Sequence, residues 1–391
     1  MDVPLLLLEI NSLTYFPFRS LVAYWLCLPS PSHLITPRHQ LKTDYNISKY
    51  TRTLPDEIRP TVQRALLFER DGTDRVSCQI EDTVPCPPNK FRRPSGECNN
   101  VRHPKWGNRG ARFLRMLPPD YADGKSLPRQ SSTHTALPSP LDVAATLQAV
   151  PPNNHRYVTS LLGAWSELVL HDLAGTGNLD GRNCCSDEGA RHEECYGRLG
   201  RGQCRQYMRT LPAVDMDDCS FDYRNQMNLA SSYLDGSAVY GNTDQQVEKL
   251  RTYDAGLVNV SACSACQTNA LYSAILKEHN RIAVNLGQLN RHWSDERLFL
   301  ESKRIVTAEI QHITFNEYLP IVLGEEAIVH TELELKAHGR FSKYSSAKRG
   351  GVYNEVAITA LPALLSMLPT NIMNETVESF AEMVDLLITN A

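Results

Sequence analysis

Apolar residues recur at helical spacing along most of the chain from residue 155 onward, which predicts amphipathic helices. The clearest pattern spans residues 294–320, where Ser294 precedes two acidic residues and apolar side chains follow on one stripe. Ser139 is placed to cap a shorter helix over 141–150. The remaining predicted helices span 155–173, 223–234, 244–252, 268–289, 354–368 and 375–389. Because no alternating run is long enough to predict a strand, the predicted fold class is all-α and mainly helical.

Two long stretches lack this periodicity and are predicted to be loops. Residues 98–140 are rich in Arg, Pro and Gly, which predicts a long, ordered surface wrap instead of a packed helix. Residues 180–222 carry five cysteines and are predicted to be a disulfide-bonded loop. The chain before this domain is polar with scattered prolines. We therefore predict a leader or propeptide-like region over 1–95 and one main domain over 96–391.

Composition narrows the class of protein. The chain has 391 residues, of which 42% are hydrophobic, so it can bury a sizeable core. A net charge of −4 and a pI of about 6.3 do not suggest a nucleic-acid partner. The basic stretches 109–115 and 340–349 are interpreted as solvated loops, in preference to a polyanion site. No apolar run is long enough to span a bilayer.

Cysteine usage indicates an oxidising compartment. Ten of the eleven cysteines lie between Cys78 and Cys266, which favours disulfides in a secreted chain. Cys263-x-x-Cys266 stands without a matching second pair, so zinc binding is not predicted. A redox pair is the alternative for these two residues. A structural disulfide is favoured, because no neighbouring charge would lower the pKa of a thiol there.

The first residues support secretion less clearly. An apolar run over 21–28 follows Arg19 and precedes Pro-Ser-Pro-Ser, which resembles an imperfect signal peptide. A mispredicted start codon or an unusual propeptide is the alternative. Three sequons, at Asn46, Asn259 and Asn374, fit an extracellular glycoprotein.

The helix predicted up to residue 173 delivers His171 and Asp172 at its end, just before Ala-Gly-Thr-Gly. Taken alone, such a pair is more often a cap or a surface pair. A second candidate lies in one loop, where four residues alternate: Ser231, Tyr233, Asp235 and Ser237. With Asp172, their oxygens approach the six to eight that calcium prefers. A polar loop with an N-cap is the simpler alternative.

These segments occur with three further motifs in a characteristic order. They are Cys98-Asn-Asn through Trp106-Gly, Leu117-Pro-Pro-x-Tyr-x-Asp-Gly, and Glu278-His-Asn-Arg, with Arg224-Asn-Gln-Met-Asn leading into the calcium loop. The order resembles the animal haem peroxidases, arthropod members above all, over about residues 95–369. The resemblance implies a mainly helical fold, haem b, calcium, and hydrogen peroxide with a small reducing substrate as partners.

Residue by residue, the resemblance implies the following roles. His171 matches the distal base, and the calcium ligands would be Asp172, Ser231, Tyr233 through its carbonyl, Asp235 and Ser237. Glu167 takes the place of the family's usual Gln and would put a charge in the haem pocket. In Glu278-His279-Asn280-Arg281, the His and Arg are expected to make structural polar contacts.

Several positions depart from the family pattern. Leu170 stands where an Asp can form an ester to haem. Counting back about seventeen residues from Glu278 places Ser261 at the catalytic arginine and Ser264 at the second ester carboxylate. Residues 257–272 are also fewer than the family has at this place, so an insertion-sized piece is missing.

The helix that carries the axial ligand departs most. Residues 354–369 resemble the family helix with Arg-x-Gly-His-Ser, but Pro362, Leu364 and Leu365 fall at the Arg, Gly and His positions. Leucine cannot ligate iron, and a mid-helix proline kinks or breaks the hydrogen-bond ladder. His338 is the nearest alternative ligand, and its predicted loop setting disfavours it. The family continues beyond this point, so we interpret the domain as truncated at its C-terminus.

Three functions follow from these features. The first is a secreted animal haem-peroxidase homologue that is catalytically impaired, because no haem axial ligand is found and Ser261 replaces the arginine. The second is an active, peroxide-consuming oxidoreductase whose gene model is incomplete. The third is a non-enzymatic extracellular binding or matrix protein that reuses the fold.

Overall fold

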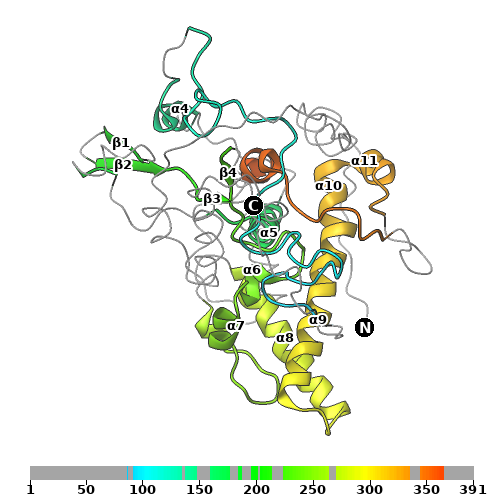
Figure 1. Cartoon of the computed structure of the whole chain (residues 1–391). Coiled ribbons are helices and arrows are strands. Elements are labelled where there is room, and N and C mark those ends of the chain that lie inside the picture. Colours follow the sequence, from blue (N-terminus) through cyan, green and yellow to red (C-terminus); the bar gives the residue numbers. More distant parts are fainter. Residues whose placement is uncertain are drawn as a thin grey trace, which may run out of the picture. The chain divides into compact units, whose positions relative to one another are not determined.

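A computed structural model describes residues 86, 91–133, 137–147, 159–176, 184–186, 195–200, 203–213, 223–263, 270–334 and 344–364 (Figure 1). Residues 311–334 belong to one compact unit and the other described residues to a second. Several predicted features lie outside the described residues: Asn46, Ser264, His338, Leu365, Asn374 and the helix predicted over 375–389.

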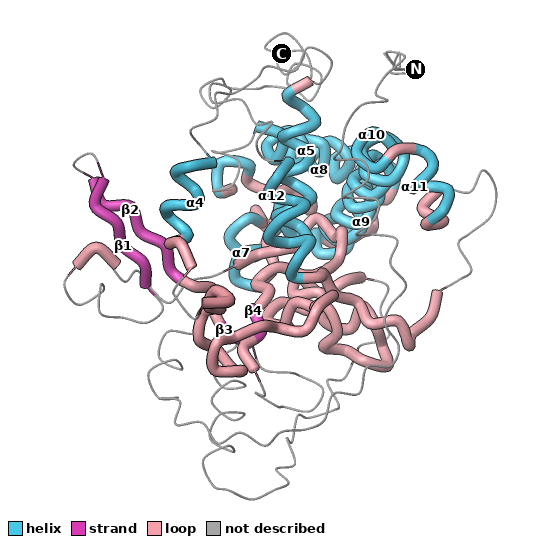
Figure 2. The backbone as a smooth tube through the Cα atoms, turned by 90° about the horizontal axis from the view of Figure 1, so that it is seen from above, coloured by secondary structure: helices cyan, strands magenta, loops and turns pink. Residues whose placement is uncertain are grey.

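The chain is mainly helical, as predicted (Figure 2). The three longest described helices are α5 (Ser160–Leu173), α8 (Ala270–Leu289) and α9 (Asp295–Ile313). They match the predicted helices closely. The apolar residues predicted to face the core on α8 are buried. On α9, Leu298 and Ile310 are buried as predicted, whereas Ile305 is 38% exposed and Val306 is buried in its place. The short helix α4 (Pro140–Leu147) precedes α5, and α6 (Ser237–Tyr240) and α7 (Asp244–Leu250) lie between α5 and α8 in the chain. The Thr243 hydroxyl caps α7 by accepting from the Gln246 amide.

Two helices contain a π turn immediately before a proline. Thr314–Tyr318 precedes α10 (Leu319–Leu323), which continues into α11 (Glu325–His330). Val356–Ala360 precedes α12 (Leu361–Leu364) in the same way. In each case the residue before the proline donates to the carbonyl five residues back, as in Leu319 to Thr314. Proline has no N–H, so the wider turn carries the chain past the missing bond. The predicted kink therefore takes the form of a π turn.

Four short strands are present among the described residues, although no run in the sequence is long enough to predict a strand. β1 (Cys195–Gly200) and β2 (Gln203–Met208) form an antiparallel hairpin within the Cys-rich loop. β3 (Pro212–Ala213) pairs with β4 (Asn225–Gln226). The prediction of a helix over 223–234 was wrong. Its backbone amides bond to other segments, as in Met227 to the Leu211 carbonyl at 2.9 Å, which leaves no intrahelical ladder.

A long irregular wrap was predicted over residues 98–140, and residues 98–133 are irregular as predicted, but part of this segment is buried. Phe113 is 1% exposed, and its amide donates to the Gln226 carbonyl at 2.9 Å. The next residue bonds to the segment before α12, which ties that helix to the wrap. Phe113 packs with Leu170, Ala174 and Ala357 in one apolar cluster. Leu361 of α12 packs against this cluster, and Figure 2 shows α12 beside α5.

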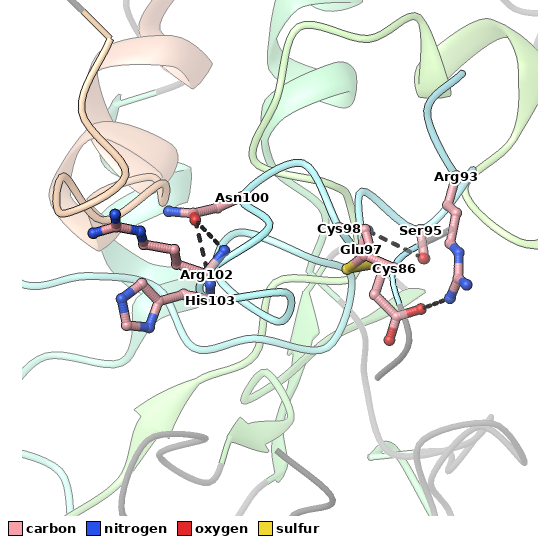
Figure 3. The surroundings of a disulfide bond; sticks show 8 residues. All are labelled: Cys86, Arg93, Ser95, Glu97, Cys98, Asn100, Arg102 and His103. Carbon is pink, nitrogen blue, oxygen red and sulfur yellow. Dashed lines mark hydrogen bonds and ion pairs between the residues drawn. A yellow bond between two sulfur atoms is a disulfide. The ribbon is translucent and has the colours of Figure 1, made fainter. Parts of the chain in front are cut away.

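Disulfides are confirmed. Cys86–Cys98 closes a loop with a sequence separation of 12 residues (Figure 3). Cys184–Cys195 closes a second loop with a separation of 11 residues. Cys185 and Cys263 are disulfide-bonded as well. Each short loop restrains a segment that has little apolar material of its own. None of the described helices combines the length and apolar character needed to cross a membrane.

Candidate functional site

The last turn of α5 presents its two polar residues in opposite settings. His171 is exposed, and its Nδ1 lies 3.1 Å from the Tyr272 hydroxyl on α8. Asp172 is fully buried. Successive residues on a helix point about 100° apart, so one turn can send a histidine outward and a carboxylate inward. His171 therefore faces solvent, whereas Asp172 faces the protein interior.

The Asp172 carboxylate joins α5 to the loop before α6. Its Oδ2 accepts from the Gly236 amide at 3.0 Å, and its Oδ1 accepts from the Ala238 amide at 2.8 Å. The Ser237 hydroxyl donates to the same Oδ1 at 3.3 Å. Each bond spans more than sixty residues of sequence, so one side chain fixes the helix end against the loop.

The oxygens of the five predicted calcium ligands form one connected set. The Ser231 hydroxyl donates to Asp235 Oδ2 at 2.7 Å and lies 3.3 Å from the Tyr233 carbonyl oxygen. It also lies 3.4 Å from the Ser237 hydroxyl, which bonds to Asp172. Both serines and both aspartates are at least 95% buried. The fold thus brings together residues that the sequence placed about sixty positions apart.

Two buried carboxylates in one cluster carry an electrostatic cost. Burial and the nearby Asp235 raise the pKa of Asp172 to about 7. Burial also raises the pKa of Asp235, against the opposing effects of the Ser231 hydrogen bond and the Lys303 ammonium. A divalent cation among these oxygens would favour the ionised form of both groups.

The chemistry of the donors fits calcium. They comprise two carboxylates, two hydroxyls and one backbone carbonyl, all hard oxygen ligands. Among the described residues no group of three or more His, Cys, Asp or Glu side chains is placed to hold a metal. All five donors of the set are oxygen atoms, so it has no thiolate or imidazole donor of the kind that zinc prefers.

Asn228 supports the site and was not singled out as a site residue by the sequence. Its Oδ1 accepts from the amides of Gly175 and Ala230 at 2.9 and 3.0 Å. Its Nδ2 donates to the Leu173 carbonyl at 2.9 Å and to the Ser232 hydroxyl at 3.2 Å. The buried amide thereby binds the C-terminus of α5 to the loop. Its place at the end of Arg-Asn-Gln-Met-Asn was the one available signal.

The Tyr233 side chain anchors the loop on its other side. Its hydroxyl donates to the Trp106 carbonyl at 2.7 Å. A Cβ added to Gly350 would lie 2.6 Å from that hydroxyl, and one added to Gly107 would lie 3.0 Å from the ring. Two segments far apart in sequence therefore close on Tyr233 only because both positions are glycine.

The motif Glu278-His279-Asn280-Arg281 makes the structural contacts that the sequence predicted. His279 is fully buried, with Nδ1 2.9 Å from the Tyr240 hydroxyl and Nε2 3.0 Å from the Gly256 carbonyl oxygen. The Asn280 amide bonds to both the N–H and the C=O of Val258. Arg281 pairs with Glu278 on the surface.

Three other predicted site positions, Glu167, Leu170 and Ser261, differ in their settings. Glu167 lies one turn before His171 on α5 and is half-buried. Leu170 is 8% exposed within the apolar cluster with Phe113 and Ala357. Ser261 is exposed in the 3₁₀ turn Val260–Ala262, where its amide donates to the Asn259 side chain.

The chain is a mainly helical domain. One of its helices, α5, ends in His171 and Asp172, and Asp172 binds a buried, oxygen-rich loop. The model of the animal haem peroxidase family matches residues 91–272 and, separately, 262–388. The chain belongs to the animal haem peroxidase family, whose members are oxidoreductases that act on peroxide with haem.

Curated proteins with similar sequences include members of the same family. Chorion peroxidase of Drosophila melanogaster is 29% identical over 324 residues, which cover 68% of this chain and 40% of that protein. The human peroxidasin homolog is 27% identical over 431 residues, which cover 85% of this chain and 28% of that protein. The chain thus spans less than half the length of these relatives. Peroxidase A of Dictyostelium discoideum is a similar solved structure, with a TM-score of 0.49, 20% identity, and coverage of 71% of this chain and 59% of that one.

The described residues do not fit a haem held in the family's manner. The α5 position before His171, where an Asp could form an ester to haem, is Leu170. Its side chain cannot form that ester and packs among apolar groups. Ser261 supplies no cation and faces solvent. The buried His279 has both ring nitrogens in hydrogen bonds, so it offers no free donor to a metal. Among the predicted haem-pocket positions in the described part of the chain, His171 is the residue that matches the family.

Proposed function

We propose that this protein is an extracellular animal haem-peroxidase homologue that retains a calcium-stabilised fold and is impaired in peroxide turnover. The observation that carries the proposal is the contrast within the last turn of α5. Asp172 enters a complete buried oxygen cluster, whereas the adjacent Leu170 lies in an apolar cluster in place of a haem-linking carboxylate. The structural half of the site is kept, and the catalytic half is not.

Peroxide chemistry explains the expected impairment. Cleaving the O–O bond needs a base that moves a proton between the two oxygens and a cation that polarises the bond. His171 can serve as that base, because it is exposed and Tyr272 orients its Nδ1. Haem, when bound, would supply the oxidising centre. Ser261 brings no positive charge, and Glu167 adds an acceptor one helical turn away. Loss of one such electrostatic contribution commonly lowers turnover by about 10²–10³.

Calcium would be held by Asp172, Ser231, Tyr233 through its carbonyl, Asp235 and Ser237. Support comes from their burial, their mutual distances and their hard-oxygen character. A bound ion would neutralise the two carboxylates and bridge α5 to the loop. Its role here is structural, so it would remain useful after catalysis is lost.

Disulfides support the extracellular setting. Four described cysteines form the bonds Cys86–Cys98 and Cys184–Cys195, and such bonds persist in oxidising compartments. The sequon residue Asn259 is exposed, so it is accessible to glycosylation. Asn46 and Asn374 remain predicted glycosylation sites.

Haem titration of the purified protein tests the impairment. We expect no sharp Soret band and no peroxide-dependent oxidation of a phenol, with an active member of the family measured in parallel. A His171→Ala variant is the matched control, because residual activity that depends on the distal base would fall in it. A sharp Soret band with phenol oxidation that His171→Ala abolishes would overturn the proposal.

An active enzyme encoded by a longer transcript is the second candidate. The observation that favours it is the division of the family match at residues 262–272, next to Ser261. Sequencing the full transcript decides this. An in-frame segment with Arg-x-x-Glu between Val260 and Asn269 would favour the active enzyme. A transcript that encodes the present sequence without interruption would favour the impaired homologue.

A further inference from the structure

Two segments about 240 residues apart meet on one face of the molecule. The Asn100 side chain donates to the Ser346 carbonyl oxygen at 2.8 Å. The Arg349 guanidinium lies 5.7 Å from the centre of the Trp106 ring, and the His103 ring stacks on that ring at 3.7 Å. We call this surface the basic face and define it by Arg102, His103, Lys105, Lys348 and Arg349.

Charge is strongly segregated here. Residues 91–110 and 344–351 together carry seven Lys or Arg and a single acidic residue, Glu97, which pairs with Arg93. The whole chain, by contrast, has 40 Lys and Arg against 44 Asp and Glu. A face so different from the average concentrates positive potential and attracts anions. From the sequence, the basic stretch 340–349 was interpreted as a solvated loop. In the fold, its residues Lys348 and Arg349 belong to a larger positively charged surface with Arg102 and Lys105.

The basic side chains of this face lie at least partly in solvent. Arg102, His103 and Lys348 are exposed, and Lys105 and Arg349 are half-buried. Within the described residues, Arg102, Lys105 and Lys348 form no ion pair with a carboxylate. Their charges are thus available to a ligand without the loss of an existing pair.

The backbone beneath these side chains is held in place. The buried Asn100 accepts from the amides of Arg102 and His103 at 3.0 and 3.2 Å. Cys98, disulfide-bonded to Cys86, donates its amide to the Pro104 carbonyl at 2.9 Å. Figure 3 shows Arg102 and His103 together, with the disulfide and the Arg93–Glu97 pair on the other side of the loop. A preorganised basic loop loses less entropy when it binds.

We propose that the basic face is a binding site for a sulfated polysaccharide. The choice of ligand rests on the extracellular setting of the proposed function, where nucleic acid is not the expected polyanion. Trp106 is engaged by His103 and Arg349, so its ring is not free to stack on a base, as single-stranded nucleic acids require. The acidic balance of the whole chain disfavours a broad anionic membrane surface.

Binding of the full chain to immobilised heparin tests the site. The patch variant is Arg102→Ala/Lys105→Ala/Lys348→Ala. The matched control is Lys249→Ala/Arg291→Ala/Arg304→Ala, which removes the same charge from exposed positions elsewhere. We expect wild type and control to elute at the same salt concentration and the patch variant to bind about tenfold more weakly, with a shallower salt dependence. Thermal melting verifies that both variants fold.

Each other outcome contradicts the proposal. Equal weakening in both triple variants would show that net charge alone drives binding. Equal affinity for hyaluronan, single-stranded DNA or phosphatidylserine vesicles would exclude selectivity for sulfated chains. No binding to heparin at low salt would remove the site altogether. None of these results bears on haem binding or turnover, so the proposed impairment is tested independently.

Discussion

The Nε2 atom of His279 lies 3.0 Å from the carbonyl oxygen of Gly256, and this contact determines which ring nitrogen carries the proton. A carbonyl only accepts, so Nε2 must donate, and Nδ1 then accepts from the Tyr240 hydroxyl at 2.9 Å. The neutral ring is therefore bonded at both ends. Burial is the main reason that the pKa of His279 falls to about 4.

Acidification should destabilise the fold through His279. The folded-state pKa of about 4 lies below the ordinary value of 6.5, so the unfolded chain binds more protons between these values. Stability is therefore lost as pH falls from about 6.5 towards 4, by about 3 kcal/mol at most for this group. Urea unfolding of wild type and His279→Gln, with calcium present in both, measures the difference. We expect the variant to be less stable at neutral pH and to lose less on acidification; parallel losses would contradict the assignment.

Replacement of Gly256 should cost more than replacement of Gly124, although both have φ of +73°. An added Cβ at Gly256 would lie 2.6 Å from both the Leu298 Cβ and the Phe299 amide nitrogen, whereas nothing lies within 4 Å at Gly124. We expect Gly124→Ala to cost about 1 kcal/mol from backbone conformation alone. Gly256→Ala should cost about 3 kcal/mol, because close packing adds to it. Chemical denaturation of both variants provides the comparison, and equal costs would show that the Gly256 contact relaxes freely.

Removal of calcium should lower the melting temperature of the wild type. An ion that binds only the folded state stabilises it by about 2.7 kcal/mol at about a hundred times its dissociation constant. Asp235→Ala removes one carboxylate and the Ser231 partner, so it should melt lower and lose its sensitivity to chelator. Differential scanning calorimetry with and without chelator measures both effects. A wild-type curve that chelator leaves unchanged, after metal analysis shows complete removal, would return Asp172 and Asp235 to ordinary loop carboxylates.

Truncation of Leu170 should show that this position now serves packing. Its side chain lies in the cluster with Phe113, Ala174 and Ala357, which connects α5 to the π turn before α12. Leu170→Ala should cost about 2–4 kcal/mol, from lost burial and the cavity that remains. Leu289 is 81% exposed, so Leu289→Ala should change stability by less than about 0.5 kcal/mol. Equilibrium unfolding in urea measures both, and equal small effects would remove Leu170 from the core.

Much of the helical framework was predictable from the sequence. In long amphipathic helices such as α8 and α9, the spacing of apolar residues along the sequence indicates which face is buried. The segment 223–234 was not predictable, since its apolar residues are buried through partners elsewhere in the chain. Met227 bonds to Leu211, and Asn228 reaches Leu173 and Gly175. The spacing of apolar residues within one segment does not indicate which distant segments will bond to it.

The candidate calcium site likewise has a part that the sequence predicted and a part that it did not. The five oxygen-bearing residues were predicted as a set from the resemblance, and the fold brings them into contact. The support from Asn228 and the closure of Gly107 and Gly350 on Tyr233 were missed. Those roles depend on which segments meet, and a single amide or glycine gives no pattern along the chain. The basic face was missed for the same reason, since half of it lies near residue 102 and half near residue 348.

The π turns also affect how the chain tolerates changes in length. Each holds one residue more than an α-helical turn would, as the bonds from Leu319 to Thr314 and from Leu361 to Val356 show. Deletion of one residue within Val356–Ala360 would restore ordinary helical spacing up to Pro362. The same deletion in the middle of α8 would rotate Leu271 and Tyr272 relative to His279 by about 100° and expose part of the core. Within the described helices, the two π turns are therefore where a relative of this protein can shorten while the remaining residues keep their neighbours.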